Sequence, residues 1–343
     1  MSGIGDAGLA ALAHALDEAA PALPADARVA LLNARAGAGL PRPGWRLEQD
    51  DAAVVARLRA AGLAVAAPDG AVAECDAAIV LAPRSRDLCR ILLARAAALT
   101  AGGGRIVAVA GNQAGAGALR SDLTALAGPV SGLSKHRCRI VWSAPGAPRD
   151  AGLQARWAGL DVPVRIEGGW WSRPGLFAWD RIDAGSALLA AHLPADLAGA
   201  AADLGAGFGF LAVSLLRRCP GIGPVDLFEA DRRALAPARR NLETLAPGRE
   251  ARLHWHDVTA GLPGRYRVIV SNPPFHAGDR ADRPELGQAF IAAAAAALAP
   301  DGSLWLVANR HLPYEATLAA RFRQVRTLVQ AGGYKVLVAG DRR

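Results

Sequence analysis

The feature that most limits the possible folds is a repeated alternation of short apolar segments with amphipathic helical segments. In the first half, buried strands are expected at Arg28–Asn33, Ala77–Ala82 and Arg105–Ala110, with a helix at Asp87–Leu99. In the second half the pattern predicts strands at Ala200–Leu204, Val225–Phe228, Arg252–Trp255, Val268–Ser271 and Ser303–Ala308, and helices at Leu211–Arg218, Ala234–Leu245 and Leu286–Leu298. Strands that alternate with helices indicate a parallel sheet covered on both faces.

The last strands of the chain break this alternation. Val325–Val329 and Lys335–Ala339 are both strand candidates, and they flank the turn residues Gly332–Gly333. A glycine turn between two adjacent strands predicts an antiparallel hairpin. The expected sheet is therefore mostly parallel with an antiparallel end.

The two halves resemble each other in their order of elements. The segment AAIVLAPRSRDLCRILLARAAALTAGGGRIVAVA and the segment VIVSNPPFHAGDRADRPELGQAFIAAAAAALAPDGSLWLVAN both read as strand, polar turn, long helix, glycine turn and strand. A duplicated domain is the simplest explanation. The stretch Ser143–Asp150, rich in Pro, Gly and Ala, is the best boundary candidate, which predicts domains at 1–150 and 151–343.

Composition removes several classes of protein. The 343 residues carry 39 Lys and Arg against 31 Asp and Glu, so the net charge of +8 suits a polyanionic partner such as nucleic acid, or ordinary solubility. The four cysteines are scattered without a C-x-x-C pair, which excludes a common zinc framework and fits the reducing cytoplasm. The N-terminal segment lacks a basic region, and apolar runs such as Ile291–Ala299 are shorter than the ~20 residues of a membrane span. Secreted and membrane classes are therefore not expected.

A glycine-rich turn follows the first strand of the second half. It runs Asp203-Leu204-Gly205-Ala206-Gly207-Phe208-Gly209 between a predicted strand and a predicted helix. Glycines at alternate positions allow a sharp turn and a close approach of ligand, and the next helix N-terminus attracts a negative group. The spacing lacks the third glycine of the G-x-G-x-x-G dinucleotide fingerprint. Asp203 would repel a pyrophosphate but can receive an ammonium group, although a purely structural turn has the same appearance.

Acidic residues end the next two strands. Glu229 can accept hydrogen bonds from two ribose hydroxyls, with Asp231 as the alternative, although Asp231 is better suited to cap the following helix. Asp257 is placed to accept a hydrogen bond from an adenine amino group. His254 and His256 lie nearby, but no further Cys or His stands at metal-ligand spacing, so we expect no metal site.

The most specific signal is Asn272-Pro273-Pro274-Phe275, directly after a predicted strand. Consecutive prolines hold the backbone extended and remove two N–H donors. The side-chain oxygen of Asn272 and the carbonyl of Pro273 can then accept both hydrogens of one planar amino group, which aims its nitrogen at an electrophile. Phe275 offers a face on which a base can stack. A simple turn explains one proline but not this tetrapeptide.

In this order, the glycine turn, the two acids and N-P-P-F resemble a class I S-adenosylmethionine-dependent methyltransferase that acts on an exocyclic amine. Four segments further resemble the bacterial ribosomal RNA guanine-N2 methyltransferases of the RsmC family: Pro174–Leu189, Ser271–Gly278, Val307–Leu318 and Gly332–Val336. The resemblance covers the second half clearly and the first half faintly. It implies an α/β fold of two tandem Rossmann-like methyltransferase domains with mostly parallel seven-stranded sheets, the first of them degenerate.

The resemblance also implies roles for individual residues. Asp183, Gly185 and Ser186 match a D-x-G-S segment that we expect to border the methionine end of the cofactor. Glu229 stands where the family more commonly has Asp. The expected cofactor-binding residues are Asp183, Ser186, Asp203, Gly205, Gly207, Gly209, Glu229 and Asp257, and the expected catalytic residues are Asn272, Pro273, Pro274 and Phe275.

The first half lacks these parts. The place of the glycine turn is taken by Asn33-Ala34-Arg35-Ala36-Gly37-Ala38-Gly39, without a leading acid, and that of N-P-P-F by Leu81-Ala82-Pro83-Arg84. We expect no cofactor and no chemistry there. Its basic residues (Arg84, Arg86, Arg90, Lys135, Arg137 and Arg139) are candidates for a surface facing RNA or are simply solvated.

The expected activity is S-adenosylmethionine-dependent methylation of the exocyclic N2 of a guanine in 16S ribosomal RNA on the 30S subunit, by a cytoplasmic monomer without a metal. Three alternatives stay open from the sequence. The acceptor could be a guanine of 23S ribosomal RNA, or an adenine N6 or a glutamine N5, because those enzymes share N-P-P with an aromatic residue. The chain could also be a non-catalytic RNA-binding ribosome-assembly factor that keeps a methyltransferase shell.

Overall fold

The computed structural model describes residues 4–18, 20–66, 74–113, 115–274 and 284–343. It divides into two compact units, Met1–Val162 (unit 1) and Pro163–Arg343 (unit 2). The division falls later than the boundary expected at 150, because the helix Ala151–Ala158 packs against unit 1 and buries Trp157 in its core. The Pro- and Gly-rich stretch at 143–150 is thus a loop within unit 1.

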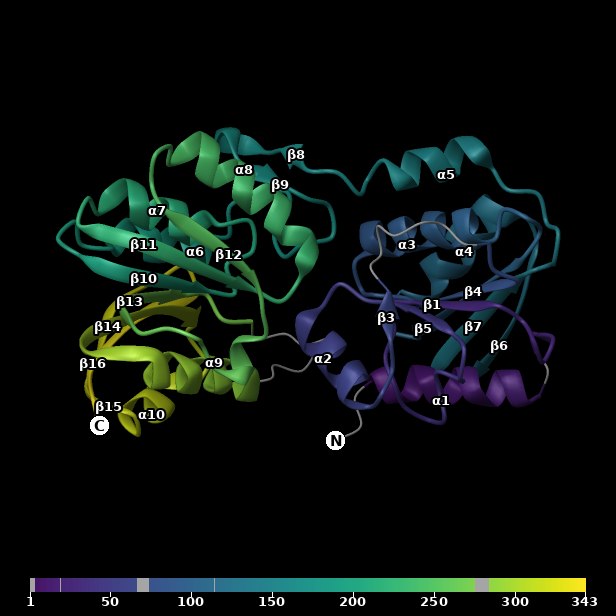
Figure 1. The fold of residues 1–343 in the computed structure, drawn as a ribbon, viewed down its shortest axis with the longest axis horizontal. Coiled ribbons are helices and arrows are strands. Elements are labelled where there is room, and N and C mark those ends of the chain that lie inside the picture. Colours follow the sequence, from purple (N-terminus) through teal and green to yellow (C-terminus); the bar gives the residue numbers. More distant parts are fainter. Residues whose placement is uncertain (1–3, 19, 67–73, 114, 275–283) are drawn as a thin grey trace. The chain divides into compact units, whose positions relative to one another are not determined.

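Unit 1 alternates strands and helices as the apolar pattern predicts (Figure 1). Its helices are α1 (Ile4–Asp17), α2 (Ala52–Ala60), α3 (Arg86–Leu99), α4 (Ala116–Ala127) and α5 (Ala151–Ala158). Its strands are β1 (Val29–Leu32), β2 (Arg46–Glu48), β3 (Val65–Ala66), β4 (Ala77–Leu81), β5 (Arg105–Gly111), β6 (Val130–Lys135) and β7 (Cys138–Ser143).

Unit 2 opens with a short hairpin and then follows the same plan. The hairpin is β8 (Val164–Arg165) with β9 (Trp171–Ser172), joined by the 3-10 turn η1 (Glu167–Gly169). The helices are α6 (Ala184–His192), α7 (Phe210–Arg218), α8 (Leu235–Leu245), α9 (Pro284–Ala297) and α10 (Tyr314–Ala319), with 3-10 turns η2 (Arg232–Ala234) and η3 (Val258–Ala260). The main strands are β10 (Gly199–Leu204), β11 (Ile222–Glu229), β12 (Ala251–Trp255), β13 (Tyr266–Ser271), β14 (Leu298–Asn309), β15 (Phe322–Ala331) and β16 (Tyr334–Arg342).

Both units contain a seven-stranded sheet of the same topology. The strand order is β3-β2-β1-β4-β5-β7-β6 in unit 1 and β12-β11-β10-β13-β14-β16-β15 in unit 2. The first five strands of each unit run parallel, and the last two form an antiparallel hairpin beside the fifth. The predicted α/β class, the duplication and the antiparallel end are therefore confirmed.

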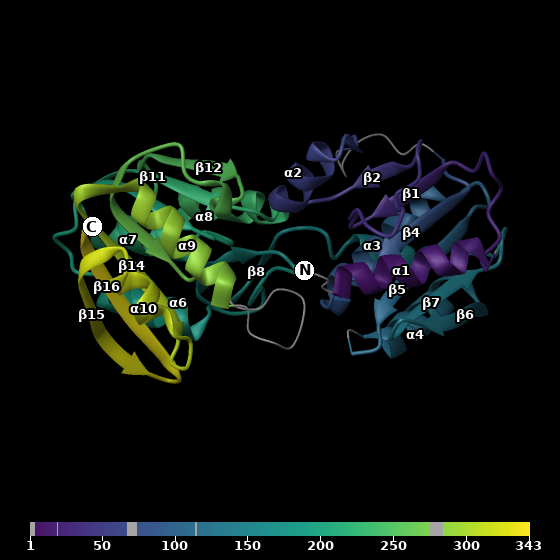
Figure 2. The ribbon, with the colours of Figure 1, turned by 90° about the horizontal axis from the view of Figure 1, so that it is seen from below.

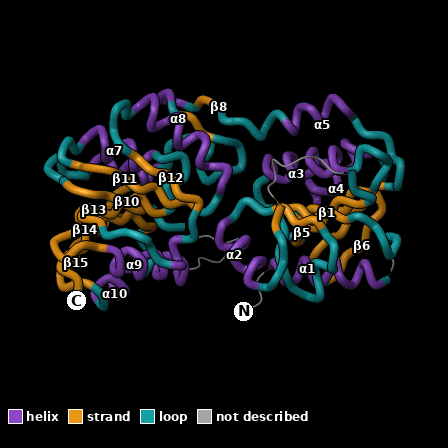
Figure 3. The backbone as a smooth tube through the Cα atoms, in the orientation of Figure 1, coloured by secondary structure: helices purple, strands orange, loops and turns teal. Residues whose placement is uncertain are grey.

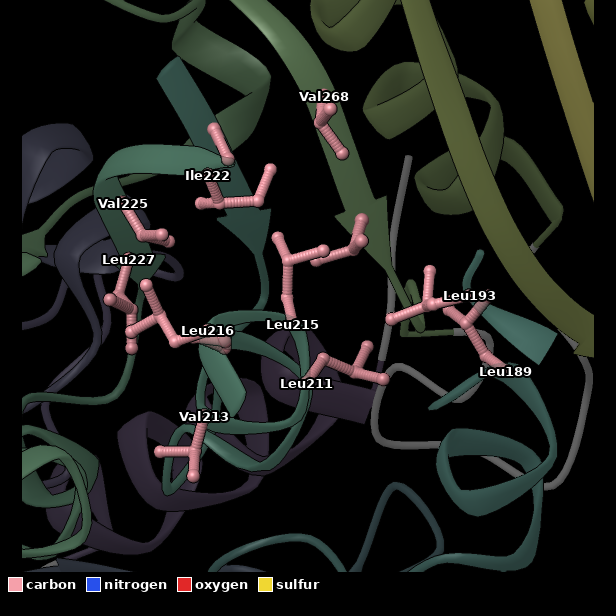
Figure 4. Packing of buried hydrophobic residues seen from close by; sticks show 14 of the residues in the cluster. Leu189, Leu193, Leu211, Val213, Leu215, Leu216, Ile222, Val225, Leu227 and Val268 are labelled. Atoms are coloured by element: carbon pink, nitrogen blue, oxygen red, sulfur yellow. The ribbon is translucent and has the colours of Figure 1, made fainter. Parts of the chain in front are cut away.

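In unit 2 the helices cover both faces of the sheet (Figures 1 and 3). One apolar layer packs α6, α7 and α8 on the sheet, with Leu189, Leu215 and Val268 buried at its centre (Figure 4). The other places α9 and α10 on the opposite face, around Ile291 and Leu318. Because both faces are buried, the inner strands read as nearly continuous apolar runs, which is why the sequence located them well.

Unit 1 repeats this arrangement with its own core. Helices α3, α4 and α5 cover one face and α1 covers the other, as the crossing of α1 over the sheet in Figure 2 illustrates. Two buried carboxylates are neutralised by arginines. Glu48 pairs with Arg46 and Arg95, and Asp122 pairs with two further arginines of α3. Buried acids require such partners because an unpaired charge is costly in a core.

Candidate active site

The candidate residues gather where three adjacent parallel strands of unit 2 end. Strand β10 lies between β11 and β13, so the segments after these strands meet at one edge of the sheet. In open α/β sheets this carboxyl edge is where ligands bind. The hydroxyl of Ser271 donates to the carbonyl of Leu204 over 2.8 Å, which ties the end of β13 to the end of β10.

The glycine-rich turn adopts the conformation that its sequence predicts. Gly205, Gly207 and Gly209 have φ values of 71°, 53° and 85°, a region that residues with a Cβ rarely occupy. A Cβ on Gly205 would stand 3.3 Å from the ring of Phe290, whereas a Cβ on Gly207 would meet no atom within 4 Å. The turn therefore packs against α9 at its first glycine and leaves space at its second.

Asp203 lies beneath this turn and is completely buried. Its Oδ2 accepts a hydrogen bond from the backbone N–H of Ala212 in α7 over 2.9 Å. Its Oδ1 is buried without a hydrogen-bond partner among the described residues. Burial raises the pKa of Asp203 to about 7, and the neighbouring Glu229 carboxylate contributes to the increase. An unsatisfied carboxylate oxygen fits a donor that a ligand brings.

Glu229, at the end of β11, closes the turn from the other side. Its Oε2 accepts from the N–H of Gly207 over 2.7 Å, and its Oε1 accepts from the N–H of Asp231 over 2.8 Å. Burial raises the pKa of Glu229 to about 7, although both backbone donors favour the charged form. Asp231 caps η2 through the N–H of Arg233, as its position in the sequence suggested.

Asp257 follows β12 at the same edge of the sheet. Its Oδ1 accepts from the backbone N–H and the hydroxyl of Thr259, at 2.9 and 2.7 Å, and so caps η3. Both histidines were expected to be sheet residues. His254 lies in β12 and bonds Asp226, whereas His256 follows the strand and bonds the carbonyl of Gly261. Within the described segments, no group of three or more His, Cys, Asp or Glu side chains could hold a metal ion.

Asn272 is joined to the segment that precedes α6. Its Nδ2 donates to Oδ2 of Asp183 and to Oγ of Ser186, both over 2.9 Å. Asp183 is the N-cap of α6, and the same Oδ2 accepts from the N–H of Ser186 over 2.8 Å. Residues 89 positions apart in the chain thus form one compact network. Pro273 is buried and Pro274 is exposed, while Phe275 lies outside the described residues.

Asn241 is a site residue that the sequence reasoning did not identify. It is completely buried in α8, where its Nδ2 donates to the carbonyls of Phe208 and Trp171, and its Oδ1 accepts from the N–H of Trp171. It therefore holds the glycine-rich turn against β9. An asparagine among the apolar positions of an amphipathic helix was the available signal, because a buried amide must be fully hydrogen-bonded.

The register of the two sheets shows which residues of unit 1 stand at the corresponding positions. Because β1 pairs with β2 as β10 pairs with β11, Leu31 occupies the place of Asp203, and Gln49 occupies that of Glu229. Asn33 stands at the first glycine of the turn. No carboxylate of unit 1 therefore occupies either acidic position.

Side chains close this edge of unit 1. Asn33 has a φ of 56°, so it keeps the left-handed turn that glycine makes in unit 2. Its Nδ2 donates to the carbonyl of Leu81 over 2.8 Å. Gln49 donates from Nε2 to the carbonyl of Ala34 and to Oδ1 of Asn33, at 2.9 and 3.3 Å. The ends of β1, β2 and β4 are thus bridged by the protein's own amides.

Comparison with known proteins agrees with this architecture. The family model described as "Methyltransferase small domain" matches residues 167–338. A Ribosomal RNA small subunit methyltransferase C from Pseudomonas paraeruginosa is 33% identical over 270 residues, which cover 77% of this chain and 79% of the relative. The protein of the same description from Shewanella baltica is 37% identical over 162 residues, and the match spans only 45% of that relative's length.

A solved structure extends the likeness to both units. The 16S rRNA N2 G1207 methyltransferase (RsmC) of T. thermophilus, in complex with AdoMet and guanosine, aligns with a TM-score of 0.75 and 28% identity. The alignment covers 94% of this chain and 90% of that one. The fold and the site define a class I methyltransferase. The chain belongs to the methyltransferase small domain family and, within it, to the small-subunit ribosomal RNA methyltransferase C family.

Proposed function

We propose that this protein transfers a methyl group from S-adenosylmethionine to the exocyclic N2 of a guanine in 16S ribosomal RNA. The observation that carries this proposal is the juxtaposition of Asn272 with the glycine-rich turn, through the bond between β13 and β10. Asn272, the residue that we propose holds the amine, lies beside a turn suited to the cofactor. A solved structure that aligns with 94% of this chain is described as a 16S rRNA N2 G1207 methyltransferase in complex with AdoMet and guanosine, which supports the choice of cofactor and substrate.

The residues at the carboxyl edge fit the cofactor. The buried, unpartnered Oδ1 of Asp203 suits its ammonium group, and the open space over Gly207 suits a close approach to the turn. Glu229 and Asp257 follow the neighbouring strands, where they would contact the ribose and the adenine. The segment that contains Asp183 and Ser186 would border the methionine end, with these two side chains turned toward Asn272. S-adenosylmethionine supplies a methyl group activated by the positive sulfur.

The chain's own contribution to the reaction is to hold the acceptor. Asn272 Oδ1 and the Pro273 carbonyl would accept the two hydrogens of the guanine amine, so that its nitrogen faces the methyl group. Because a guanine amine is a weak nucleophile, orienting its nitrogen toward the methyl group is the main way in which this site can accelerate transfer. The base must leave its stack to reach these groups, at a cost of about a few kcal/mol unless it is already exposed. Phe275 would stack on the extruded base.

We further propose that the substrate is the 30S particle, that the protein acts as a cytoplasmic monomer, and that unit 1 supports recognition without chemistry. The net charge of +8 suits a ribosomal RNA partner. Among the described residues, no helix is long and apolar enough to cross a membrane. The closed edge of unit 1 supports the absence of a second cofactor site.

The decisive experiment is tritiated methyl transfer to unmodified 30S particles, 50S particles and naked ribosomal RNA, followed by digestion to nucleosides. N2-methylguanosine from the 30S sample is the expected result. Label only in the 50S sample would move the enzyme to 23S ribosomal RNA. Bound cofactor with no labelled RNA would refute the proposal and direct the test to adenine and glutamine acceptors. Absence of cofactor binding would favour a non-catalytic assembly factor.

A further inference from the structure

We propose that Asp183, with Ser186, is a positioning residue that fixes which way the amide of Asn272 faces. The proposal rests on the function inferred above for the identity of the methyl acceptor. It goes beyond that function because it assigns these two side chains to the orientation of the catalytic amide rather than to contact with the cofactor.

Hydrogen-bond chemistry sets the orientation. An asparagine amide has two nearly isosteric ends, of which one only donates and the other only accepts. An ionised carboxylate oxygen only accepts, so the end of Asn272 that faces Asp183 must be the NH2 group. Its two hydrogens are directed to Asp183 Oδ2 and Ser186 Oγ. Oδ1 is then the polar atom left for a donor, and none of the described residues donates to it.

If the Asn272 side-chain amide were rotated by half a turn, it would be repelled by Asp183 and could not accept hydrogen bonds from the substrate amine. Rotation by half a turn would bring Oδ1 against the Asp183 carboxylate, and two acceptors would then face each other within hydrogen-bond distance. It would also present NH2 to the guanine amine, which could not accept it in that geometry. The 2.9 Å contacts therefore select the single orientation that can hold an amine.

The carboxylate itself is held rigidly. Its Oδ2 also caps α6 through the N–H of Ser186, at a helix N-terminus that favours a negative charge. Gly185, two residues after Asp183, lies so close to β16 that a Cβ there would stand 2.8 Å from the ring of Tyr334. On the other side, Ser271 fixes the backbone before Asn272. Both partners in the network are thus preorganised before substrate arrives.

The test compares Asp183→Ser and Asp183→Asn in the full-length protein. Serine is a good N-cap but is too short to reach Asn272, so it removes the orienting contact while keeping the cap. We expect kcat to fall about 10- to 100-fold with an unchanged Kd for S-adenosylmethionine. Asparagine keeps an accepting oxygen that the cap holds in place, and we expect it to restore kcat to within about threefold. Ser186→Ala should give a smaller loss of kcat.

The control is Asp150→Ser, the same exchange at the N-cap of α5 in unit 1, where Asp150 accepts from the N–H of Leu153. It should change stability as much as Asp183→Ser but leave kcat unaffected. A rise in Kd for the cofactor that equals the loss of kcat would overturn the proposal and make Asp183 a cofactor ligand. An Asp183→Ser enzyme with wild-type kcat would overturn it as well.

A second measurement is independent of methyl transfer. The chain contains five asparagines, so selective 15N labelling of asparagine gives a side-chain spectrum in which Asn272→Ala identifies the Asn272 pair. We expect Asp183→Ser, but not Asp150→Ser, to shift these two hydrogens and speed their exchange with water. An unchanged pair would overturn the positioning role even if no RNA substrate were found, whereas a shifted pair in a protein without transferase activity would refute only the proposed function.

Discussion

At the residue scale, the amide of Asn272 is the group on which transfer should depend most. Asn272→Ala removes the oxygen that we propose accepts from the amine, but it leaves the residues of the glycine-rich turn, Asp203 and Glu229 in place. We expect the single-turnover rate to fall at least about 100-fold while the Kd for S-adenosylmethionine stays within about twofold. Rapid-quench assays and titration calorimetry would measure the two quantities. Equal losses of rate and of cofactor affinity would argue against a role confined to the acceptor.

Two buried carboxyls should make unit 2 sensitive to pH. The pKa values of Asp203 and Glu229 rise from 3.8 and 4.5 to about 7. Between about pH 4 and 7 the folded state therefore binds more protons than the unfolded state, and stability falls as the pH rises, before it levels above 7. For Asp203 alone the fall is at most about 4 kcal/mol.

The Asp203→Asn variant isolates this contribution, since an amide mimics the protonated acid. In urea titrations we expect the variant to be close to the wild type in stability at pH 4 and increasingly more stable than the wild type as the pH rises to 8. The same pH dependence in both proteins would mean that burial does not perturb this carboxyl. The comparison is made without cofactor, because a bound ammonium group would stabilise the charged form.

At the element scale, the contact between α9 and α10 depends on a missing side chain. Gly287 of α9 lies against Tyr314 of α10, which is completely buried, and a Cβ at Gly287 would overlap the phenol. We expect Gly287→Ala to destabilise unit 2 by about 1–3 kcal/mol, because a close-packed core cannot absorb even one methyl group. Thermal and urea unfolding would measure the loss.

Gly117 of α4 provides the matched control. A Cβ there would meet no atom within 4 Å, so Gly117→Ala gains helix propensity and should stabilise unit 1 by up to about 1 kcal/mol. If both substitutions stabilised the protein, Tyr314 would have to move freely, and the packing of α10 on α9 would not be specific.

The elements show where sequence reasoning succeeds and where it stops. Buried central strands such as Ala77–Leu81 and Val268–Ser271 were located within a residue or two, because their apolar runs end at polar turns. The three-residue strand β2 and the hairpin β6–β7 were missed, since half of β6 is polar and exposed. Periodicity identifies long elements that bury one face. Strand β2 is too short to show a period, and the edge strand β6 is largely exposed, although β7 beside it is mostly buried.

The site was predictable to a similar extent. The motifs located the turn, Glu229 and Asn272. A close approach of the backbone to a ligand requires glycine, ribose hydroxyls require an acid, and a planar amine requires an amide oxygen, each after a strand. The links between motifs were not predictable. That Asp183 contacts Asn272, and that Asn241 supports the turn, follows from how α6 and α8 pack on the sheet. Such contacts join residues far apart in the sequence and have no local signature.

At the scale of the whole molecule, two sheets of one topology should bind one cofactor. Calorimetry with S-adenosylmethionine should give one site per chain, because unit 1 has Leu31 and Gln49 where unit 2 has its acids. Glu229→Ala should weaken binding about 10- to 100-fold, whereas the equivalent Gln49→Ala should leave it unchanged. A stoichiometry of two, or a loss of affinity with Gln49→Ala, would show that the first unit also binds the cofactor.

The closed edge of unit 1 gives the two copies different tolerance to mutation. There, Asn33 and Gln49 only join strand ends, so their replacement lowers stability, and a gain in stability anywhere else in the unit can compensate. In unit 2 the equivalent positions are those that we propose bind the cofactor, and a loss of binding there could not be compensated by a change elsewhere. Over generations, unit 1 can therefore accept many substitutions as long as it still folds, whereas unit 2 must retain the particular residues of its site.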